Sequence, residues 1–158
     1  MTHSDNALFF TQLSALQRQY SKALSMRLEP YDVRPGYLNI LYCLWEKDDI
    51  TQKELNVHIH IEQATLSNSL SRMKRDGLIE QNPNPKDRRL NHITLTEKGR
   101  SLKNAVHSAI DDLQSIVNKG LTVNDRRYFN RILRQMTEQI ENDLNDPCLM
   151  LFDEIADD

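Results

Sequence analysis

Apolar residues recur every three or four positions in the first part of the chain, as on the buried face of a helix. From about residue 6 to residue 29 this stripe comprises Phe9, Leu13, Leu16, Tyr20, Ala23, Leu24 and Leu28. It predicts a long amphipathic helix that ends at Glu29-Pro30. Because proline suits the first position of a helix, Pro35 predicts the start of a second helix, with the apolar stripe Leu38, Leu41, Tyr42 and Trp45.

The middle of the chain predicts two shorter helices joined by a tight turn. Thr51-Gln52-Lys53-Glu54 is a capping box, in which the threonine oxygen accepts a hydrogen bond from the amide three residues on and the glutamate reaches back. A helix is therefore expected from Thr51 to near His58. The next helix is expected over about residues 62–76, with a buried stripe and a left-handed stop at Gly77; the stripe is Leu66, Leu70 and Met73.

A β-hairpin and two further helices follow in the pattern. Residues 78–81 and 89–96 are rich in apolar and β-branched side chains, and the turn-rich segment 82–87 separates them. One long helix is expected from about residue 96 to residue 119, and a last one from Thr122 toward Pro147. The order predicts a mainly α fold with a small β-wing, in which a winged helix-turn-helix lies between long helices.

Composition and charge narrow the functional classes. With 158 residues the chain fits one domain, and its net charge of −3 by itself argues against a nucleic-acid partner. The distribution of charge reverses that expectation, because residues 51–100 hold nine basic against six acidic residues, an excess of three. Residues 141–158 hold seven acidic residues and no Lys or Arg. The absence of a secretory leader, of a membrane-length apolar run and of paired cysteines predicts a cytoplasmic protein with reduced thiols.

The second short helix and the hairpin tip carry groups that suit DNA. Side chains able to bond base edges or phosphates lie on the helix at Gln63, Thr65, Ser67, Asn68, Ser71 and Arg72. The tip places Asp87 among the basic residues Lys86, Arg88 and Arg89, and an extended basic tip can lay an arginine in the minor groove. Any surface helix has a polar face, so the helix alone is a weak signal and the hairpin strengthens it.

Several segments resemble the MarR family of bacterial regulators. The residues that carry this resemblance are Thr51-Gln52-Lys53-Glu54-Leu55, Arg72-Met73-Lys74-Arg75-Asp76-Gly77-Leu78-Ile79, Pro83-Asn84-Pro85-Lys86-Asp87-Arg88-Arg89 and Leu95-Thr96-Glu97-Lys98-Gly99. The resemblance implies a single domain over 1–145, with a DNA-binding module at 34–95, dimerisation helices at 8–29 and 96–144, and an acidic tail at 146–158.

The resemblance also implies roles for residues. Arg89 is expected in the minor groove with Asp87 orienting it, and Arg72 near the DNA backbone. Base or phosphate contacts are expected from Gln63, Thr65, Ser67 and Asn68. The family's obligate dimers imply a pseudo-palindromic site read by two helices about 34 to 36 Å apart.

Other constellations are weaker. Arg34, Tyr37 and Tyr42 could line a pocket for a small phenolic ligand of the kind that the family binds, although capping and core packing explain them more simply. His58, His60 and Glu62 could suggest a metal but are interpreted more simply as polar loop residues. Cys43 is expected as a small buried residue, with a thiol sensor as the alternative.

The sequence thus predicts a dimeric, sequence-specific DNA-binding regulator, a repressor released by a small ligand. The chain has no phosphate-binding loop and no nucleophile motif, so neither an enzyme nor a cofactor is expected. The alternative is a winged-helix protein-interaction module, which would need an exposed apolar patch rather than Arg72, Arg88 and Arg89 on its DNA-facing elements.

Overall fold

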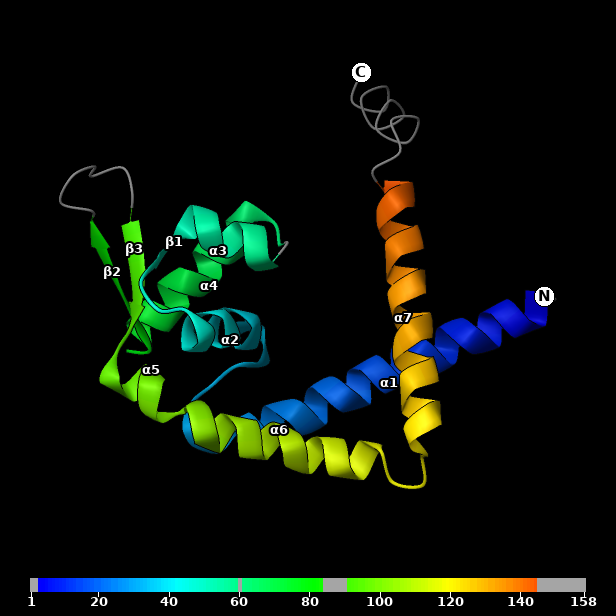
Figure 1. The fold of residues 1–158 in the computed structure, drawn as a ribbon. Helices are drawn as coiled ribbons and strands as arrows, with labels where there is room; N and C mark the ends of the chain where they lie inside the picture. The colour runs from blue at the N-terminus through cyan, green and yellow to red at the C-terminus, as the bar shows by residue number, and fades with distance from the viewer. Residues whose placement is uncertain (1–2, 60, 84–90, 145–158) are drawn as a thin grey trace, which may run out of the picture. The chain divides into compact units, whose positions relative to one another are not determined.

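A computed structural model describes residues 3–59, 61–83 and 91–144 of the chain (Figure 1). The chain divides into two compact units, residues 1–114 and residues 115–158, which are described in turn. Within the described residues, no helix is both long enough and apolar enough to cross a membrane.

The first helix, α1 (His3–Leu28), confirms the long helix predicted from the apolar stripe. Only its C-terminal part lies in the core of this chain, where Leu24 and Leu28 are buried. The first half of the stripe stays exposed at Phe9 (42%), Leu13 (41%) and Leu16 (47%). The sequence pattern therefore predicted the helix correctly, but the first unit by itself does not cover its whole apolar face.

Two short 3-10 helices lead from α1 to α2. They are η1 (Glu29–Tyr31) and η2 (Pro35–Tyr37), and α2 spans Leu38–Glu46. Pro35 thus opens a 3-10 turn ahead of the α-helix rather than the α-helix itself. The buried side chains of α2 are Leu38, Ile40, Leu41 and Leu44.

The capping box at the start of α3 (Gln52–Ile59) is present as predicted. The Glu54 amide donates to Thr51 Oγ1 at 3.2 Å, and the Thr51 amide donates to a Glu54 carboxylate oxygen at 2.8 Å. The following helix, α4 (Gln63–Arg75), ends before Gly77, whose φ of 71° is the left-handed stop expected there. These two helices form the helix-turn-helix.

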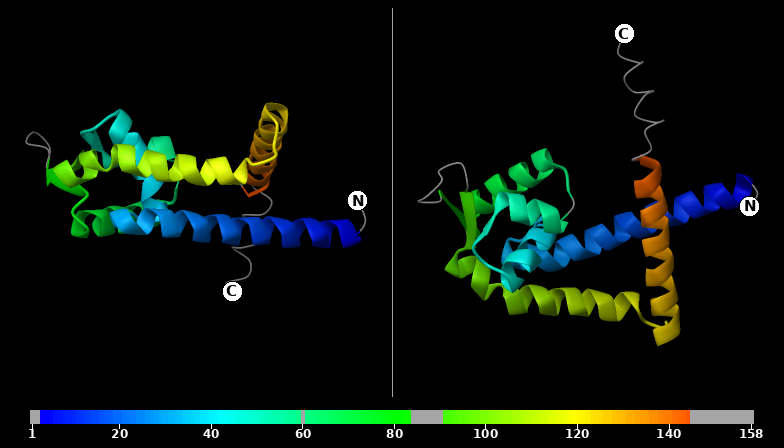
Figure 2. Two further views of the ribbon diagram at one scale, coloured as in Figure 1. Left: turned by 90° about the horizontal axis from the view of Figure 1, so that it is seen from below. Right: turned by 45° about the horizontal axis from the view of Figure 1, so that its top comes forward.

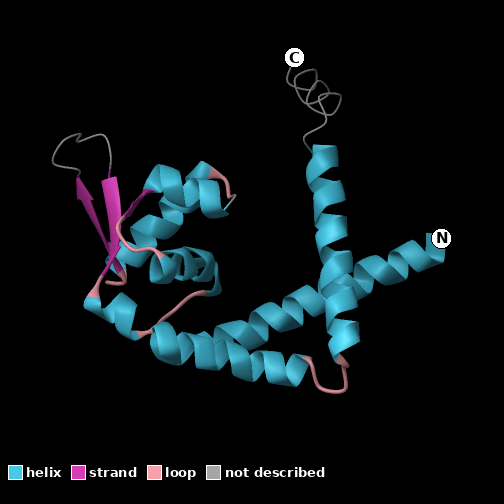
Figure 3. Ribbon diagram, in the orientation of Figure 1, coloured by secondary structure: helices cyan, strands magenta, loops and turns pink. Residues whose placement is uncertain are grey.

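The hairpin consists of β2 (Ile79–Pro83) and β3 (Asn91–Leu95), which pair in antiparallel register from Ile79↔Leu95 to Pro83↔Asn91. A two-residue strand that the sequence pattern did not predict, β1 (Ile50–Thr51), pairs with the other edge of β3. The sheet order is β1-β3-β2 (Figure 3). Because β1 lies directly before α3, it ties the helix-turn-helix to the wing.

The prediction of a single long helix over residues 96–119 is wrong in one respect. It is divided at Leu102 into α5 (Glu97–Ser101) and α6 (Lys103–Val117). The carbonyl of Gly99 accepts a hydrogen bond from Trp45 Nε1 at 2.9 Å, so an indole from α2 engages a helix carbonyl just ahead of the interruption. Spacing of apolar residues along the chain carries no signal for such a contact.

The core of the first unit gathers apolar side chains from α1, α2, α3, α4, the sheet and α6. Its fully buried members include Leu28, Ile40, Leu41, Leu55, Leu66, Leu70 and Ile93. The core therefore fixes α4 from its apolar side and leaves its other face outward. The two views in Figure 2 show the ribbon of α3 beside that of α2.

The second unit contains α7 (Val123–Leu144). The helix begins after Thr122, as predicted, and a second capping box marks this start: the Thr122 amide donates to the Asp125 carboxylate at 2.8 Å, and the Asp125 amide donates to Thr122 Oγ1 at 3.1 Å. None of the side chains of α7 is buried. Its apolar side chains are exposed, and include Phe129 (47%), Ile132 (41%), Leu133 (37%) and Ile140 (58%).

Candidate DNA-binding surface

The outer face of α4 is polar and exposed. Thr65, Asn68 and Arg72 are exposed and follow one another at spacings of three and four, so they share one face of the helix. The opposite face consists of Leu66, Leu70 and Met73, each fully buried. Packing therefore fixes which side of α4 points outward, and that side carries an amide, a hydroxyl and a guanidinium.

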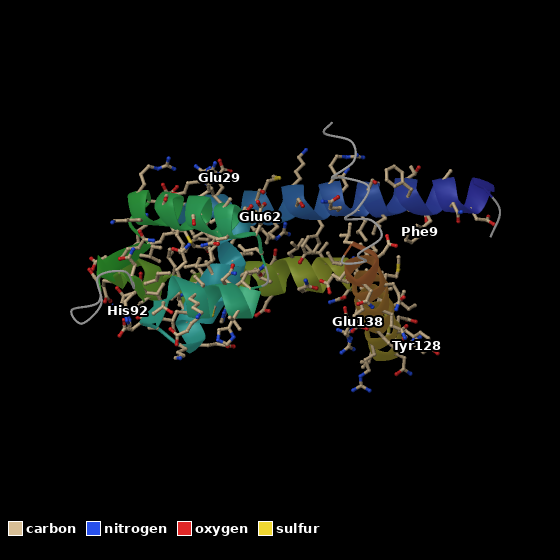
Figure 4. All side chains as sticks on the ribbon, turned by 90° about the horizontal axis from the view of Figure 1, so that it is seen from above. Phe9, Glu29, Glu62, His92, Tyr128 and Glu138 are labelled. Atoms are coloured by element: carbon tan, nitrogen blue, oxygen red, sulfur yellow. The ribbon has the colours of Figure 1, made fainter. Side chains whose placement is uncertain are left out.

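Two other residues predicted for this site lie toward α3. Ser67 is half-buried, and its Oγ accepts a hydrogen bond from Gln52 Nε2 at 2.9 Å. This bond joins the start of α3 to the second turn of α4. Gln63 is exposed in the first turn of α4, directly after Glu62, which Figure 4 labels.

A groove runs along the start of both helices of the helix-turn-helix. Its lining is Thr51, Gln52, Lys53, Asn56, Val57, Gln63, Leu66 and Asn91. Lys53 and Asn91 were not predicted for the site from the sequence. Lys53 could have been found as a basic residue in the first turn after the capping box, whereas Asn91 enters only because β3 is paired beside β1.

The last turn of α4 is basic, with Arg72, Lys74 and Arg75. Cations at a helix C-terminus are stabilised by the partial negative charge of the helix dipole. Arg75 Nε donates to Asp76 Oδ1 at 3.1 Å. The positive charge at this end of α4 is therefore favoured by the local structure.

The tip of the wing lies outside the described residues. This applies to Lys86, Asp87, Arg88 and Arg89, whose predicted roles stay predictions. The strands on either side of the tip are described, up to the Pro83↔Asn91 pair. Next to that pair, His92 Nδ1 lies 2.9 Å from the Asp49 carboxylate, and Figure 4 labels His92.

The three residues predicted for a ligand pocket are not brought together around one described cavity. Arg34 lines a hollow at the end of α1, and Tyr42 lines a different one between α2 and α3. Tyr37 is buried, and its hydroxyl donates to Asp76 Oδ2 at 2.8 Å. Burial raises the pKa of Tyr37 and the bond to Asp76 raises it further, while the same bond lowers the pKa of Asp76.

Cys43 and His58 line the same hollow as Tyr42. Cys43 is half-buried rather than buried, and desolvation raises the pKa of its thiol, with Glu46 raising it further and Lys47 opposing. A raised pKa reduces the thiolate fraction, which disfavours the sensor interpretation of Cys43. His60, one of the three residues considered for a metal, lies outside the described residues.

A polar helix face beside a three-stranded wing defines a winged helix-turn-helix protein. Residues 35–90 match the model of the MarR family. The organic hydroperoxide resistance transcriptional regulator of Bacillus subtilis is 34% identical over 100 residues, which cover 63% of this chain and 67% of that protein. The chain belongs to the MarR family of transcriptional regulators, whose members bind DNA and are not enzymes.

Other relatives agree with this assignment. The transcriptional repressor IacR of Pseudomonas putida is 25% identical over 132 residues, covering 84% of this chain and 79% of that protein. Among solved structures, a mutant of MarR from E. coli in complex with operator DNA has a TM-score of 0.73 at 22% identity. That similarity covers 86% of this chain and 99% of that one, and it bears on the fold.

Proposed function

We propose that two copies of this chain read a pseudo-palindromic operator, with α4 of each copy in a major groove. In this proposal Thr65, Asn68 and Gln63 contact bases or phosphates, and Arg72 contacts the DNA backbone. Arg89 enters the minor groove beside Asp87, while Lys86 and Arg88 contact phosphates. Ser67 is proposed to contact bases or phosphates as well, and its hydroxyl also accepts the bond from Gln52 that holds α3 against α4.

The observation that carries the proposal is the division of α4 into two faces. A buried apolar side and an outward polar side ending in basic residues suit a helix that is fixed from behind and inserts into a groove. A protein-docking surface would instead present apolar side chains there. Within the described helix-turn-helix, Val57 on α3 is the one large apolar residue that is exposed. This gives the docking alternative little support.

Dimerisation is supported by the apolar faces of α1 and α7. Large exposed apolar surfaces on regular helices cost free energy in water, and a second copy would cover them. The exposed side chains on α1 include Leu8, Phe9, Phe10, Leu13 and Leu16, and those on α7 include Phe129, Ile132 and Leu133.

We also propose that the protein represses transcription and that a small ligand releases it from DNA. The repressor names of the relatives IacR and NicR support repression. Support for a ligand comes from BpsR of Bordetella bronchiseptica, a protein of similar fold whose DNA binding is regulated by 6-hydroxynicotinic acid. Release requires that the ligand bind more tightly to the form that does not fit the operator.

The test is fluorescence anisotropy with the DNA upstream of this protein's own gene and with a scrambled duplex, across a salt series. Wild type is compared with Arg72→Ala, Arg89→Ala and, as a matched control on α7, Arg134→Ala. We expect specific, steeply salt-dependent binding that Arg89→Ala weakens by about 1–3 kcal/mol. Arg72→Ala is expected to weaken binding to both duplexes and to reduce the salt slope by about one, as loss of a phosphate contact does.

Each outcome has a distinct meaning. Equal binding to both duplexes would show that the protein binds DNA but that its operator lies outside the upstream DNA tested. An unchanged affinity in Arg72→Ala would contradict the backbone role of that residue. Failure of wild type to bind any duplex at low salt would overturn the proposal.

A further inference from the structure

The start of α5 is hydrogen-bonded to the segment that directly follows α4. The Thr96 amide donates to the Leu78 carbonyl at 3.0 Å, and Thr96 Oγ1 donates to the Gly77 carbonyl at 2.7 Å. Lys98 Nζ donates to the Asp76 carbonyl at 3.0 Å. Because these bonds hold the segment directly after α4, we expect α5 and α4 to move as one body.

The interruption at Leu102 separates this body from α6, and Trp45 spans it. The Trp45 indole Nε1 donates to the Gly99 carbonyl before the interruption, at 2.9 Å. The Trp45 carbonyl accepts from Lys103 Nζ after the interruption, at 3.4 Å. Figure 1 shows α2, which carries Trp45, beside the junction of α5 and α6.

Three rings extend this contact along α6. The Trp45 ring meets His107 edge-on, with the ring centroids 5.5 Å apart and the planes at 87°. Tyr42, one turn earlier on α2, stacks on His107, with the ring centroids 5.4 Å apart and the planes at 21°. Aromatic pairs of this kind prefer particular geometries, so the cluster favours one orientation of α6 against α2.

We propose that Trp45 is a positioning residue that holds the α5–α6 interruption in one geometry and thereby sets how α4 is presented to DNA. The inference rests on the proposed function, because it assigns a structural control to α4, the helix proposed to enter the major groove. Trp45 contacts segments on both sides of the interruption, so a change in the angle between α5 and α6 would break at least one of its contacts.

The single tryptophan of the chain makes this proposal directly measurable. Its emission reports on Trp45 alone, although Trp45 lies on α2 rather than on the DNA-facing helix. The probe is a duplex that wild type binds specifically in the anisotropy experiment, with the scrambled duplex at equal occupancy as the control. Because the proposal holds the interruption in one geometry, we expect the emission of Trp45 to stay unchanged when either duplex binds.

The second arm uses Trp45→Phe, which keeps an aromatic ring and removes the indole N–H. Loss of one ordinary hydrogen bond corresponds to roughly a 2- to 10-fold change in an equilibrium constant, so we expect the operator Kd to rise by that factor. Ile40→Val is the matched control, because it shortens a fully buried side chain on the same helix and leaves the Trp45 contacts in place. It should leave the operator Kd unchanged while lowering thermal stability.

The outcomes separate this inference from the function on which it rests. Wild-type binding with an equal Kd for Trp45→Phe, or with a shift in Trp45 emission, would overturn the positioning role and leave the DNA-binding proposal standing. Equal weakening by Ile40→Val would also overturn it, because general loss of stability would then explain both variants. Failure of wild type to bind any duplex would remove both proposals.

Discussion

Gly99 occupies a position where no side chain fits. A methyl group at this residue would collide with the backbone carbonyl oxygen of Leu78, while also pressing on the Leu95 side chain. The close approach is what allows the start of α5 to pack against the chain that follows α4. Glycine is therefore needed because there is no room for a side chain. Its backbone angle does not require glycine, since its φ is not in the left-handed region.

Gly99→Ala is accordingly expected to lower the free energy of unfolding by roughly 1–3 kcal/mol, the usual cost of overpacking. Gly36→Ala is the matched control, because no atom lies within 4 Å of a methyl group there. It should be neutral or stabilising by up to about 1 kcal/mol through a less flexible unfolded chain. Urea denaturation of both variants checks the prediction, and equal effects would contradict it.

The capping box at the start of α3 controls the pKa of the Glu54 carboxyl. Hydrogen bonds from the Thr51 amide and hydroxyl lower the pKa of Glu54 to about 2. Since the folded-state pKa is below the unfolded value of about 4.5, this carboxylate stabilises the fold fully above that pH and loses the effect as the pH falls toward 2.

We expect Thr51→Ala to raise the pKa of Glu54 toward the ordinary value for glutamate, about 4.3. The measurement is an NMR titration of the Glu54 carboxyl carbon. Thr137→Ala, whose hydroxyl bonds within α7, should leave that titration unchanged. A Glu54 pKa that does not move in Thr51→Ala would show that the hydroxyl contributes nothing and would leave the bond from the backbone amide of residue 51 as the cause.

At the scale of elements, the Tyr37–Asp76 bond joins η2, directly before α2, to the residue that follows α4. The carboxylate is well shielded, with 14% of its side chain exposed. A hydrogen bond to a charged group is worth about 1.5–3 kcal/mol, so Tyr37→Phe should lower the free energy of unfolding by that amount. Tyr128→Phe on α7, where the residue is 63% exposed, is the control expected to have little effect. Thermal unfolding of the two variants distinguishes a buried link from a surface one.

Elements were predicted well from the sequence where a local signal exists. Thr51, Thr122 and Gly77 mark helix ends through hydrogen bonds and backbone angles that depend on near neighbours, and all three are confirmed. The strand at Ile50 and the interruption at Leu102 were missed because both arise from contacts with distant segments. Ile50 needs Ile93 as its partner, and the interruption adjoins the Gly99 carbonyl that Trp45 binds.

The same distinction applies to the candidate site. The outward side of α4 followed from its apolar period, so the exposure of Thr65, Asn68 and Arg72 was predictable. The bond from Gln52 to Ser67 and the groove residue Asn91 were not, because they depend on how α3 and β3 pack against α4. Arg34 and Tyr42 line different described hollows, and their proposed role with Tyr37 in binding a ligand stays a prediction.

At the scale of the whole molecule, the proposed dimer gives a direct prediction of mass. Light scattering should yield about twice the 18.5 kDa of one chain. Leu13→Glu places a charge in the exposed apolar stripe of α1 and should shift the protein toward the monomer, whereas Gln12→Glu, on the same helix, should not. A dimer that survives Leu13→Glu unchanged would place the interface away from this stripe.

The exposed apolar faces of α1 and α7 have a consequence for the life of the protein in a cell. If a second copy covers them, folding and association are linked by mass action, and the midpoint of thermal unfolding rises with protein concentration. For a regulator kept at low abundance, the fraction of folded molecules would then decrease as its copy number falls. The number of copies would set how much of the protein survives proteolysis, as well as how often the DNA is occupied.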